Sequence, residues 1–208
     1  MKPPIREIPG GGVLADTQIR AAMATGRIVI DPPPTKVGSN SVNLTLGRWL
    51  AVYTSPVLDP HRDNPVRYIE IPSEGFRLQP GLLYLGVTRE YTEAHGLLPN
   101  LDGRSSIGRL GTFVHITAGR GDIGFCGHWT MELMVARLVP RPWWAALWPW
   151  YEEGVILRPG DAIAQLTWQE AGLCSVPYAH KPDAKYAQHG RDHDPRPQPS
   201  RYWKDLRR

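Results

Sequence analysis

The stretch from Asp102 to Val135 reads DGRSSIGRLGTFVHITAGRGDIGFCGHWTMELMV, and its last seven residues indicate how the chain folds. In an extended strand over 129–135, alternate side chains point to opposite faces. Glu132 then lies on the face opposite an apolar one formed by Trp129, Met131, Leu133 and Val135. A carboxylate in such a strand must face solvent, a partner charge or a functional site. From the strand alone, a salt-bridged structural glutamate is the better explanation, and a functional residue is the alternative.

Segments of similar character lie on both sides of this strand. Further strands, enriched in β-branched and aromatic residues, are predicted over 27–30, 41–53, 82–88, 113–117 and 162–168. Pro-Gly turns at 80–81 and 159–160 separate some of them. A short helix is predicted over Thr17–Thr25, with Asp16 as its N-cap and Gly26 ending it. The pattern predicts a mainly β fold with one short N-terminal helix, in a single domain over 1–208.

Three segments depart from the strand pattern. Residues 1–15 are rich in Pro and Gly, which predicts an irregular arm. Residues 136–156 hold a Trp-rich insert, and PRPWWAALWPWY at 140–151 contains four of the eight tryptophans. We interpret this insert as an extended hairpin with packed aromatic side chains. The alternatives are that it covers an active site, binds a partner or alters substrate choice. Residues 177–208 are polar and predict a C-terminal tail.

Composition narrows the class of protein. The 208 residues carry a net charge of +4, and four basic residues lie among the last eight. No nucleic-acid motif accompanies this charge, so a basic pocket for a small polyanion is favoured over nucleic-acid binding. The two cysteines, Cys126 and Cys174, form no C-x-x-C pair, which argues against a disulfide framework or a cysteine zinc site. No apolar run predicts a membrane span or a signal peptide, so we expect a cytoplasmic protein.

A turn at 103–106 adds a second candidate function. Gly103-Arg104-Ser105-Ser106 places a guanidinium and two hydroxyls within four residues, and Arg109 follows nearby. Such a turn can present several donors to phosphate oxygens. Considered alone, an ordinary surface turn with two arginines is the commoner explanation.

Together these segments resemble the dCTP deaminase family of the dUTPase-like superfamily. GRSSIGRLG (103–111) resembles the family's phosphate and subunit-interface motif, and HITAGRGDIGF (115–125) with GHWTMEL (127–133) resembles its base-and-sugar motif. The family's opening helix and strand, its first motif and its nucleotide-closing tail are resembled by DTQIRAAMATGRIVIDP (16–32), SNSVNLTLG (39–47) and PYAHKPDAKYAQHG (177–190) with PSR (199–201). The matches follow the family's order along nearly the whole chain.

The resemblance implies a fold, an assembly and an activity. The fold is a distorted jelly-roll-type β-barrel, and the assembly is a homotrimer with active sites between subunits and a tail that closes over the nucleotide. The implied enzyme is a zinc-independent hydrolase that deaminates dCTP to dUTP and ammonia. The alternatives are a bifunctional deaminase and diphosphatase that gives dUMP, a deaminase of a modified or different cytosine nucleotide, and a non-catalytic nucleotide sensor.

The resemblance also implies roles for individual residues. Glu132 is the catalytic general acid and base, and Arg109 orients it or the substrate. The implied substrate-binding residues are the phosphate ligands Arg104, Ser105 and Ser106; Ala118 at the cytosine edge; the pocket arginine Arg120; Asp122 at the deoxyribose 3′-hydroxyl; and the triphosphate contacts Tyr178, Lys185 and Gln188.

The chemistry suits a single carboxylate. Water attack at C4 of cytosine needs a base for the water proton and an acid for N3 and the leaving amine. Burial raises the pKa of a carboxyl toward the range useful for both steps, and Arg109 is expected to oppose that shift for Glu132. Zinc deaminases carry H-x-E and P-C-x-x-C ligands, and neither pattern is present. We therefore expect no zinc, no metal ligand from the chain, and Mg²⁺ bound through the nucleotide phosphates.

Some positions depart from the family pattern. Asn43 and Thr45 stand where its first motif carries Asp and Arg, which argues against metal-assisted pyrophosphate cleavage. Gly121 replaces an apolar residue and predicts a looser or reshaped base pocket. We interpret His115 as a packed, hydrogen-bonded residue rather than a catalyst, and His128 as accessory or structural.

Overall fold

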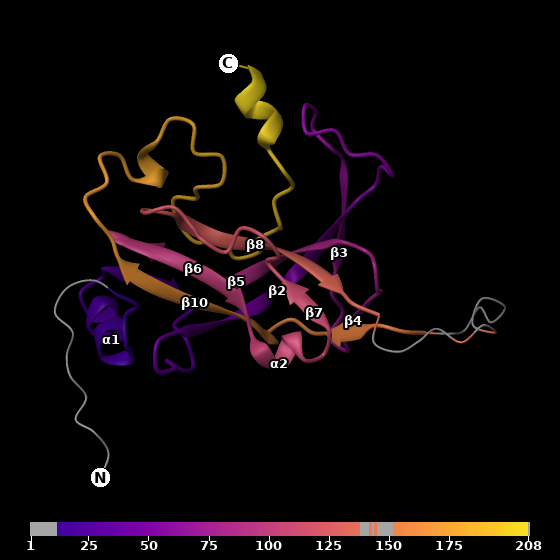
Figure 1. Ribbon diagram of the computed structural model, residues 1–208, viewed down its shortest axis with the longest axis horizontal. Helices are drawn as coiled ribbons and strands as arrows, with labels where there is room; N and C mark the ends of the chain where they lie inside the picture. Colours follow the sequence, from indigo (N-terminus) through magenta and orange to yellow (C-terminus); the bar gives the residue numbers. More distant parts are fainter. Residues whose placement is uncertain (1–11, 138–141, 143, 145–151, 208) are drawn as a thin grey trace, which may run out of the picture.

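The computed structural model describes residues 12–137, 142, 144 and 152–207, and its main element is an eight-stranded antiparallel sheet (Figure 1). Six strands follow the order β6-β10-β2-β5-β8-β7, while β1 pairs with β5 and β3 pairs with β2. These strands are β1 (Ile28–Asp31), β2 (Val42–Tyr53), β3 (Val66–Glu70), β5 (Tyr84–Ala94), β6 (Leu97–Gly103), β7 (Thr112–Val114), β8 (Cys126–Val135) and β10 (Ala162–Glu170). A second sheet pairs β4 (Phe76–Leu78) with β9 (Val155–Leu157).

The large sheet curls into a nearly closed, distorted barrel. Its edge strands β6 and β7 approach so closely that a Cβ atom on Gly103 would lie 3.1 Å from the Cβ atom of Val114. Register shifts interrupt the pairing of β2 with β5, of β5 with β8 and of β10 with β2, and such bulges bend strands. The predicted mainly β, barrel-like fold with a short N-terminal helix is confirmed.

Alternating burial along β8 fixes which side of the barrel wall carries Glu132. Trp129, Met131, Leu133 and Val135 are at most 6% exposed and face the core, as predicted. Complete burial of a side chain such as Leu133 contributes about 1.5–3 kcal/mol. A one-residue register slip would exchange this face for the one that carries Glu132, so the apolar core fixes the register.

Local structure corrects several predicted boundaries. Helix α1 spans Asp16–Ala24, and its N-cap is Ala15, whose N–H donates to the Gln18 side chain at 2.9 Å. Asp16 instead lies in the first turn, where a negative charge suits the helix dipole. Strand β7 ends at Val114 rather than at 117, because His115 has a left-handed φ of 57° that a strand cannot continue.

Four strands were not predicted. Strand β6 contains Pro99, which a sheet tolerates here because β6 is an edge strand. Strands β3 and β4 lie in the segment 54–80, between the predicted strands 41–53 and 82–88, and β4 pairs with β9. Strands β4 and β9 have three residues each and pair with one another, and β6 pairs with the distant β10, so local composition alone does not reveal these three strands.

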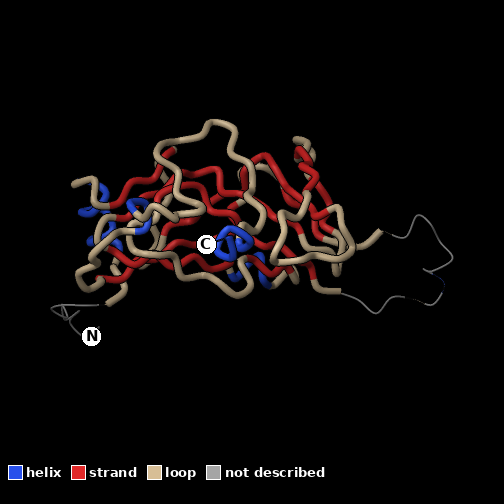
Figure 2. The backbone as a smooth tube through the Cα atoms, turned by 90° about the horizontal axis from the view of Figure 1, so that it is seen from above, coloured by secondary structure: helices blue, strands red, loops and turns tan. Residues whose placement is uncertain are grey.

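The structure tests the predictions for the three non-strand segments to different extents. Residues 1–11 of the predicted arm and most of the Trp-rich insert lie outside the described residues. The tail follows the outside of the barrel and forms the short 3₁₀ helices η2 (Tyr178–His180) and η3 (Tyr202–Arg207). Helix η3 stands away from the barrel in Figure 1 and lies next to the C-terminus marked in Figure 2. Across the described part of the chain, helices are too short or too polar to span a membrane.

Candidate active site

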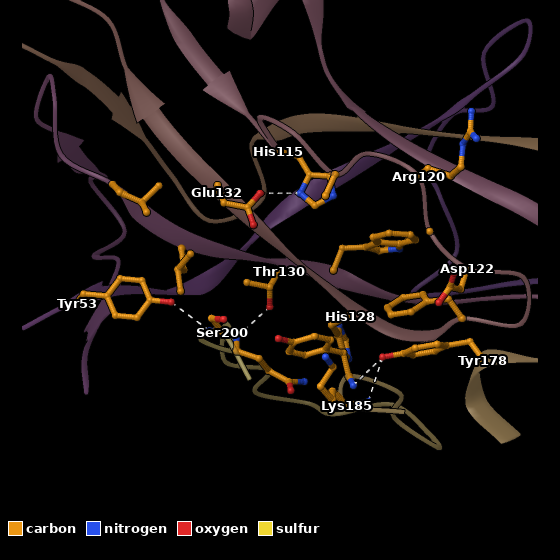
Figure 3. A pocket seen from close by; sticks show the side chains of 18 residues that line it. Tyr53, His115, Arg120, Asp122, His128, Thr130, Glu132, Tyr178, Lys185 and Ser200 are labelled. Atoms are coloured by element: carbon orange, nitrogen blue, oxygen red, sulfur yellow. Dashed lines mark hydrogen bonds and ion pairs between the residues drawn. The ribbon is translucent and has the colours of Figure 1, made fainter. Parts of the chain in front are cut away.

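A cavity of about 560 Å³ lies between β8, the loop 115–125 and the tail. Its lining combines side chains from segments far apart in sequence, and Figure 3 labels ten of them: Tyr53, His115, Arg120, Asp122, His128, Thr130, Glu132, Tyr178, Lys185 and Ser200. Polar groups from the loop and the tail therefore meet at one face of β8. Such a concave site with few converging polar groups is the usual form of a small-molecule site.

Glu132 enters this cavity from the middle of β8. Its neighbours Met131 and Leu133 are fully buried on the core side, whereas the Glu132 side chain is 38% exposed on the cavity side. Leu85 of β5 pairs with it across the sheet and also lines the cavity. The carboxylate is thus held on a rigid strand, between apolar surroundings and solvent.

His115 is the residue whose role the sequence did not reveal. Its backbone N–H donates to the Glu132 carbonyl at 2.8 Å, and its Nδ1 lies 2.9 Å from Glu132 Oε2 (Figure 3). The His115 side chain is only 8% exposed, and its buried Nε2 has no hydrogen-bond partner among the described residues. His115 is packed and hydrogen-bonded as predicted, but its partner is the candidate catalytic carboxylate.

This pair sets the protonation of the carboxylate. Burial raises the pKa of Glu132, but the hydrogen bond and the charge of His115 together lower it by more. The pKa of Glu132 therefore lies below the ordinary glutamate value. The predicted rise from burial is therefore outweighed. The opposing group is His115 rather than Arg109, because Arg109 is exposed and its guanidinium lies 3.5 Å from the Ser105 hydroxyl.

The loop between β7 and β8 brings three predicted residues to the cavity. Ala118, Arg120 and Asp122 all line it, and the Arg120 side chain extends away from Glu132 (Figure 3). The loop is tied to β6 because the N–H of Gly121 donates to the Pro99 carbonyl at 3.0 Å. The space beside Gly121 is not loose, since the Trp129 ring fills it.

The tail supplies two of its three predicted residues. Tyr178 and Lys185 line the cavity, and the Tyr178 hydroxyl accepts hydrogen bonds from the N–H groups of Lys185 and Tyr186, each at 3.1 Å. The Lys185 ammonium forms an ion pair with Asp205, which raises the pKa of Lys185. Gln188 does not line the cavity, because its side-chain oxygen accepts the N–H of His128 at 3.1 Å.

His128 braces the tail against β8. Its side chain is 3% exposed, Nδ1 lies 3.1 Å from the Thr88 carbonyl and Nε2 lies 3.3 Å from the N–H of Asp192. Burial lowers the pKa of His128, so the ring is held neutral between two backbone groups. This geometry fits the accessory or structural role predicted for it.

The predicted phosphate turn lies away from this cavity. Arg104 precedes the short helix α2 (Ser105–Gly108), and its guanidinium donates to the Ala162 carbonyl at 3.2 Å. Ser105, Ser106 and Arg109 are exposed. None of these four residues lines the Glu132 cavity of the same chain.

Metal-binding groups are absent from the described part of the chain, where no three His, Cys, Asp or Glu side chains are arranged to hold a metal ion. Cys126 is buried and Cys174 is exposed, and both are free. The absence of zinc and the use of Mg²⁺ stay predictions.

A family model described as dCTP deaminase-like matches residues 13–141, more than half of the chain. The chain belongs to the dCTP deaminase-like family. The matched residues include α1, the α2 turn, His115 and Glu132, whereas the tail lies beyond them. The predicted family is confirmed.

Three curated relatives of this dCTP deaminase-like protein share the name "dCTP deaminase, dUMP-forming". That of Leptospira biflexa is 57% identical over 109 residues, covering 52% of this chain and 63% of the relative. That of Clostridium beijerinckii is 50% identical over 107 residues, covering 51% and 62%. That of Cytophaga hutchinsonii is 48% identical over 122 residues, covering 58% and 70%. The chain thus spans under two thirds of the length of the first two relatives.

A solved structure supports the fold of this dCTP deaminase-like protein. The crystal structure of 2′-deoxycytidine 5′-triphosphate deaminase from Agrobacterium tumefaciens aligns with a TM-score of 0.58 and 18% identity. The alignment covers 77% of this chain and 49% of that one. At this identity the likeness concerns the fold alone.

Proposed function

We propose that this protein is a hydrolase that deaminates the cytosine of dCTP, with Glu132 as its general acid and base. The observation that carries the proposal is a half-exposed carboxylate on a rigid strand, hydrogen-bonded by a buried histidine inside a cavity. The names of the curated relatives support the substrate.

The proposed reaction needs one proton carrier. Glu132, ionised because its pKa is lowered, takes a proton from water as the oxygen attacks C4 of the base. The protonated carboxyl then delivers that proton to N3, and the hydroxyl proton passes through Glu132 to the amino group. The C4–N bond breaks, ammonia leaves and a uracil remains. His115 acts as a positioning residue, since it fixes Oε2 and leaves the other carboxylate oxygen for water.

We further propose that the final product is dUMP. The family resemblance implied dUTP as the product, and Asn43 and Thr45 argued against pyrophosphate cleavage. The shared name of these curated relatives instead supports the alternative product, dUMP. Release of dUMP requires hydrolysis of the bond between the α- and β-phosphates, which gives pyrophosphate. Mg²⁺ would neutralise phosphate charge and take most of its ligands from the nucleotide and water, since Glu132 and Asp122 are the carboxylates among the described lining residues.

The proposed site is shared between copies of this chain. Arg104, Ser105, Ser106 and Arg109 form a donor-rich turn that does not reach the cavity of its own chain. Leu110, Phe113 and Ile116 beside the turn are about half exposed, which is unusual for three neighbouring large apolar side chains. Docking of this patch on a second copy would bury it and bring the turn to the partner's cavity. We propose a homotrimer, and cytoplasmic location stays a prediction.

Product analysis tests the activity. The protein is incubated with dCTP and Mg²⁺, and chromatography separates dCTP, dUTP and dUMP while ammonia and pyrophosphate are measured. Ammonia with dUMP and pyrophosphate is the expected result, and Glu132→Gln is the control. Ammonia with dUTP alone would restore the first product assignment. Binding of dCTP without ammonia would favour the nucleotide-sensor alternative.

A further inference from the structure

Residues 194–200 of the tail, the tail strap, lie against β2 and β3 on the face of the sheet that carries Glu132. Tyr68 of β3 pairs with Ala51 of β2, and Ala51 pairs with Leu85 of β5. Leu85 in turn pairs with Glu132 of β8. Directly paired residues point to the same face of a sheet, so one row of side chains joins the carboxylate to the strands that the strap contacts.

The indole of Trp49 holds the start of the tail strap. Its N–H donates to the Asp194 carboxylate at 2.7 Å, and the guanidinium carbon of Arg196 lies 4.4 Å from the centroid of its ring. The same guanidinium carbon lies 5.3 Å from the centroid of the Tyr68 ring. Because the two rings are diagonal neighbours on the paired strands β2 and β3, one cation contacts both. These four residues form a clasp between the strap and the sheet.

The tail strap itself is stiff. It reads DPRPQPS, with proline at 195, 197 and 199. Proline fixes φ near −65° and has no N–H, so this segment has few conformations to lose and few donors to satisfy. Pro195 and Pro197 are buried, whereas Arg196 between them is exposed. A position that is set at the clasp is therefore passed along the strap to its other end.

The other end of the tail strap lies in the wall of the cavity. The N–H of Gln198 donates to the Thr130 hydroxyl at 2.9 Å, and the N–H of Ser200 donates to the Tyr53 hydroxyl at 3.1 Å (Figure 3). Gln198 and Ser200 line the cavity, and Thr130 shares a face of β8 with Glu132. The buried Oε1 of Gln198 accepts no hydrogen bond from the described residues. A buried acceptor without a donor is costly, which suits a wall that meets a polar ligand.

We propose that Trp49 and Arg196 are positioning residues, whose clasp holds the tail strap and its two cavity-lining residues beside Glu132. The kinetic consequence rests on the proposed function, whereas the docking of the strap does not depend on it. Every contact of the clasp is made within the chain, and none uses a phosphate group. The clasp therefore acts on substrate binding by preorganising the cavity wall and leaves proton transfer at Glu132 unchanged.

Steady-state kinetics with dCTP separate this role from catalysis. Trp49→Ala removes a hydrogen bond to a carboxylate and a cation–π contact, so KM should rise about tenfold while kcat stays within about twofold. Arg196→Met keeps the length of the side chain without its charge and should raise KM about threefold, and Arg196→Lys should restore most of this loss. Arg62→Met is the matched control, because Arg62 pairs with Asp59 outside the clasp and does not line the cavity.

Hydrogen exchange of backbone amides tests the docking without substrate. The amides of Gln198 and Ser200 should exchange about tenfold faster in Trp49→Ala than in the wild-type protein. The β8 amides should stay protected in both proteins, which separates release of the strap from general misfolding. Equal exchange at Gln198 and Ser200, a fall in kcat at unchanged KM, or the same rise of KM in Arg62→Met overturns the proposal. A wild-type protein with a protected strap that releases no ammonia from dCTP refutes the proposed function and leaves the clasp intact.

Discussion

The Glu132 cavity and the α2 turn carry the same kind of polar groups but are built in opposite ways. In the cavity, the functional groups are held by partners from the same chain: Glu132 by His115, and Lys185 by Asp205. At the turn, Ser105, Ser106 and Arg109 are exposed beside an apolar patch. The cavity groups find their partners within one chain, whereas the turn is proposed to act against a second copy of the chain.

The difference teaches where each part of the proposed chemistry resides. Proton transfer needs a carboxylate fixed within tenths of an ångström, and a rigid strand with a buried histidine provides that. Phosphate binding tolerates looser geometry, so its donors can come from another copy of the chain. We therefore expect the two regions to respond differently to mutation.

The largest effect is expected at Glu132. Glu132→Gln keeps the size and hydrogen-bonding reach of the side chain but cannot carry a proton, so turnover should fall by roughly a hundred- to ten-thousand-fold. Ammonia release measured beside a dCTP titration checks this, and dCTP binding should persist. Near-normal turnover would remove Glu132 from the mechanism, and the cavity would no longer be the place of proton transfer.

A smaller loss of turnover is expected from Arg104→Ala, and complementation in mixed trimers should restore part of it. Each inactive variant keeps the part that the other lacks, so mixed trimers of Arg104→Ala and Glu132→Gln should regain about a quarter of the sites. Activity is measured after joint refolding and, as a control, after simple mixing of the assembled proteins. No recovery in joint trimers would place the turn and the carboxylate in the same chain's site or in unrelated ones.

Removal of the tail should affect substrate binding more than assembly. Truncation after Val176 deletes Tyr178 and Lys185 from the cavity, so KM for dCTP should rise at least tenfold because charge-assisted contacts to phosphate are lost. Lys185→Met is the finer variant, since it keeps the tail and removes one charge. Sedimentation should still show the trimer. A monomeric truncation product would show that the tail is needed for assembly rather than for substrate binding alone.

The effect of His115→Phe is expected mainly in the pH profile. His115 holds the pKa of Glu132 below the ordinary value, so its loss should move the acidic limb of kcat/KM to higher pH. By the same linkage, the wild-type pair stabilises the fold above the ordinary glutamate pKa, and this contribution is lost as pH falls through the lowered pKa. His115→Gln keeps a hydrogen-bond donor and should shift the limb less. Identical limbs in all three proteins would mean that His115 does not act on Glu132.

The smallest effect is expected from zinc removal. In the described part of the chain no three His, Cys, Asp or Glu side chains are arranged to hold a metal ion, so a zinc-selective chelator should leave turnover unchanged and elemental analysis should find no stoichiometric zinc. Removal of Mg²⁺ should lower turnover, because Mg²⁺ is proposed to bind with the phosphates. One zinc per chain, lost together with activity, would refute the single-carboxylate mechanism.

The sequence by itself determined the features that depend on local periodicity. Alternation along 129–135 was enough to place Glu132 opposite the core face, because side chains of a strand alternate strictly. The motif order along the chain was enough for the family and the barrel-type fold. These features could be predicted because each is encoded in a few consecutive residues.

Only the tertiary structure decided which side chains meet. His115 reaches Glu132 because its left-handed backbone ends β7 and because β7 pairs with β8. Gln188 turns to the backbone of His128 instead of the cavity, and Trp129 fills the space beside Gly121. Each contact joins residues whose separation in space is set by strand pairing and core packing, and no pattern of neighbouring residues records that distance.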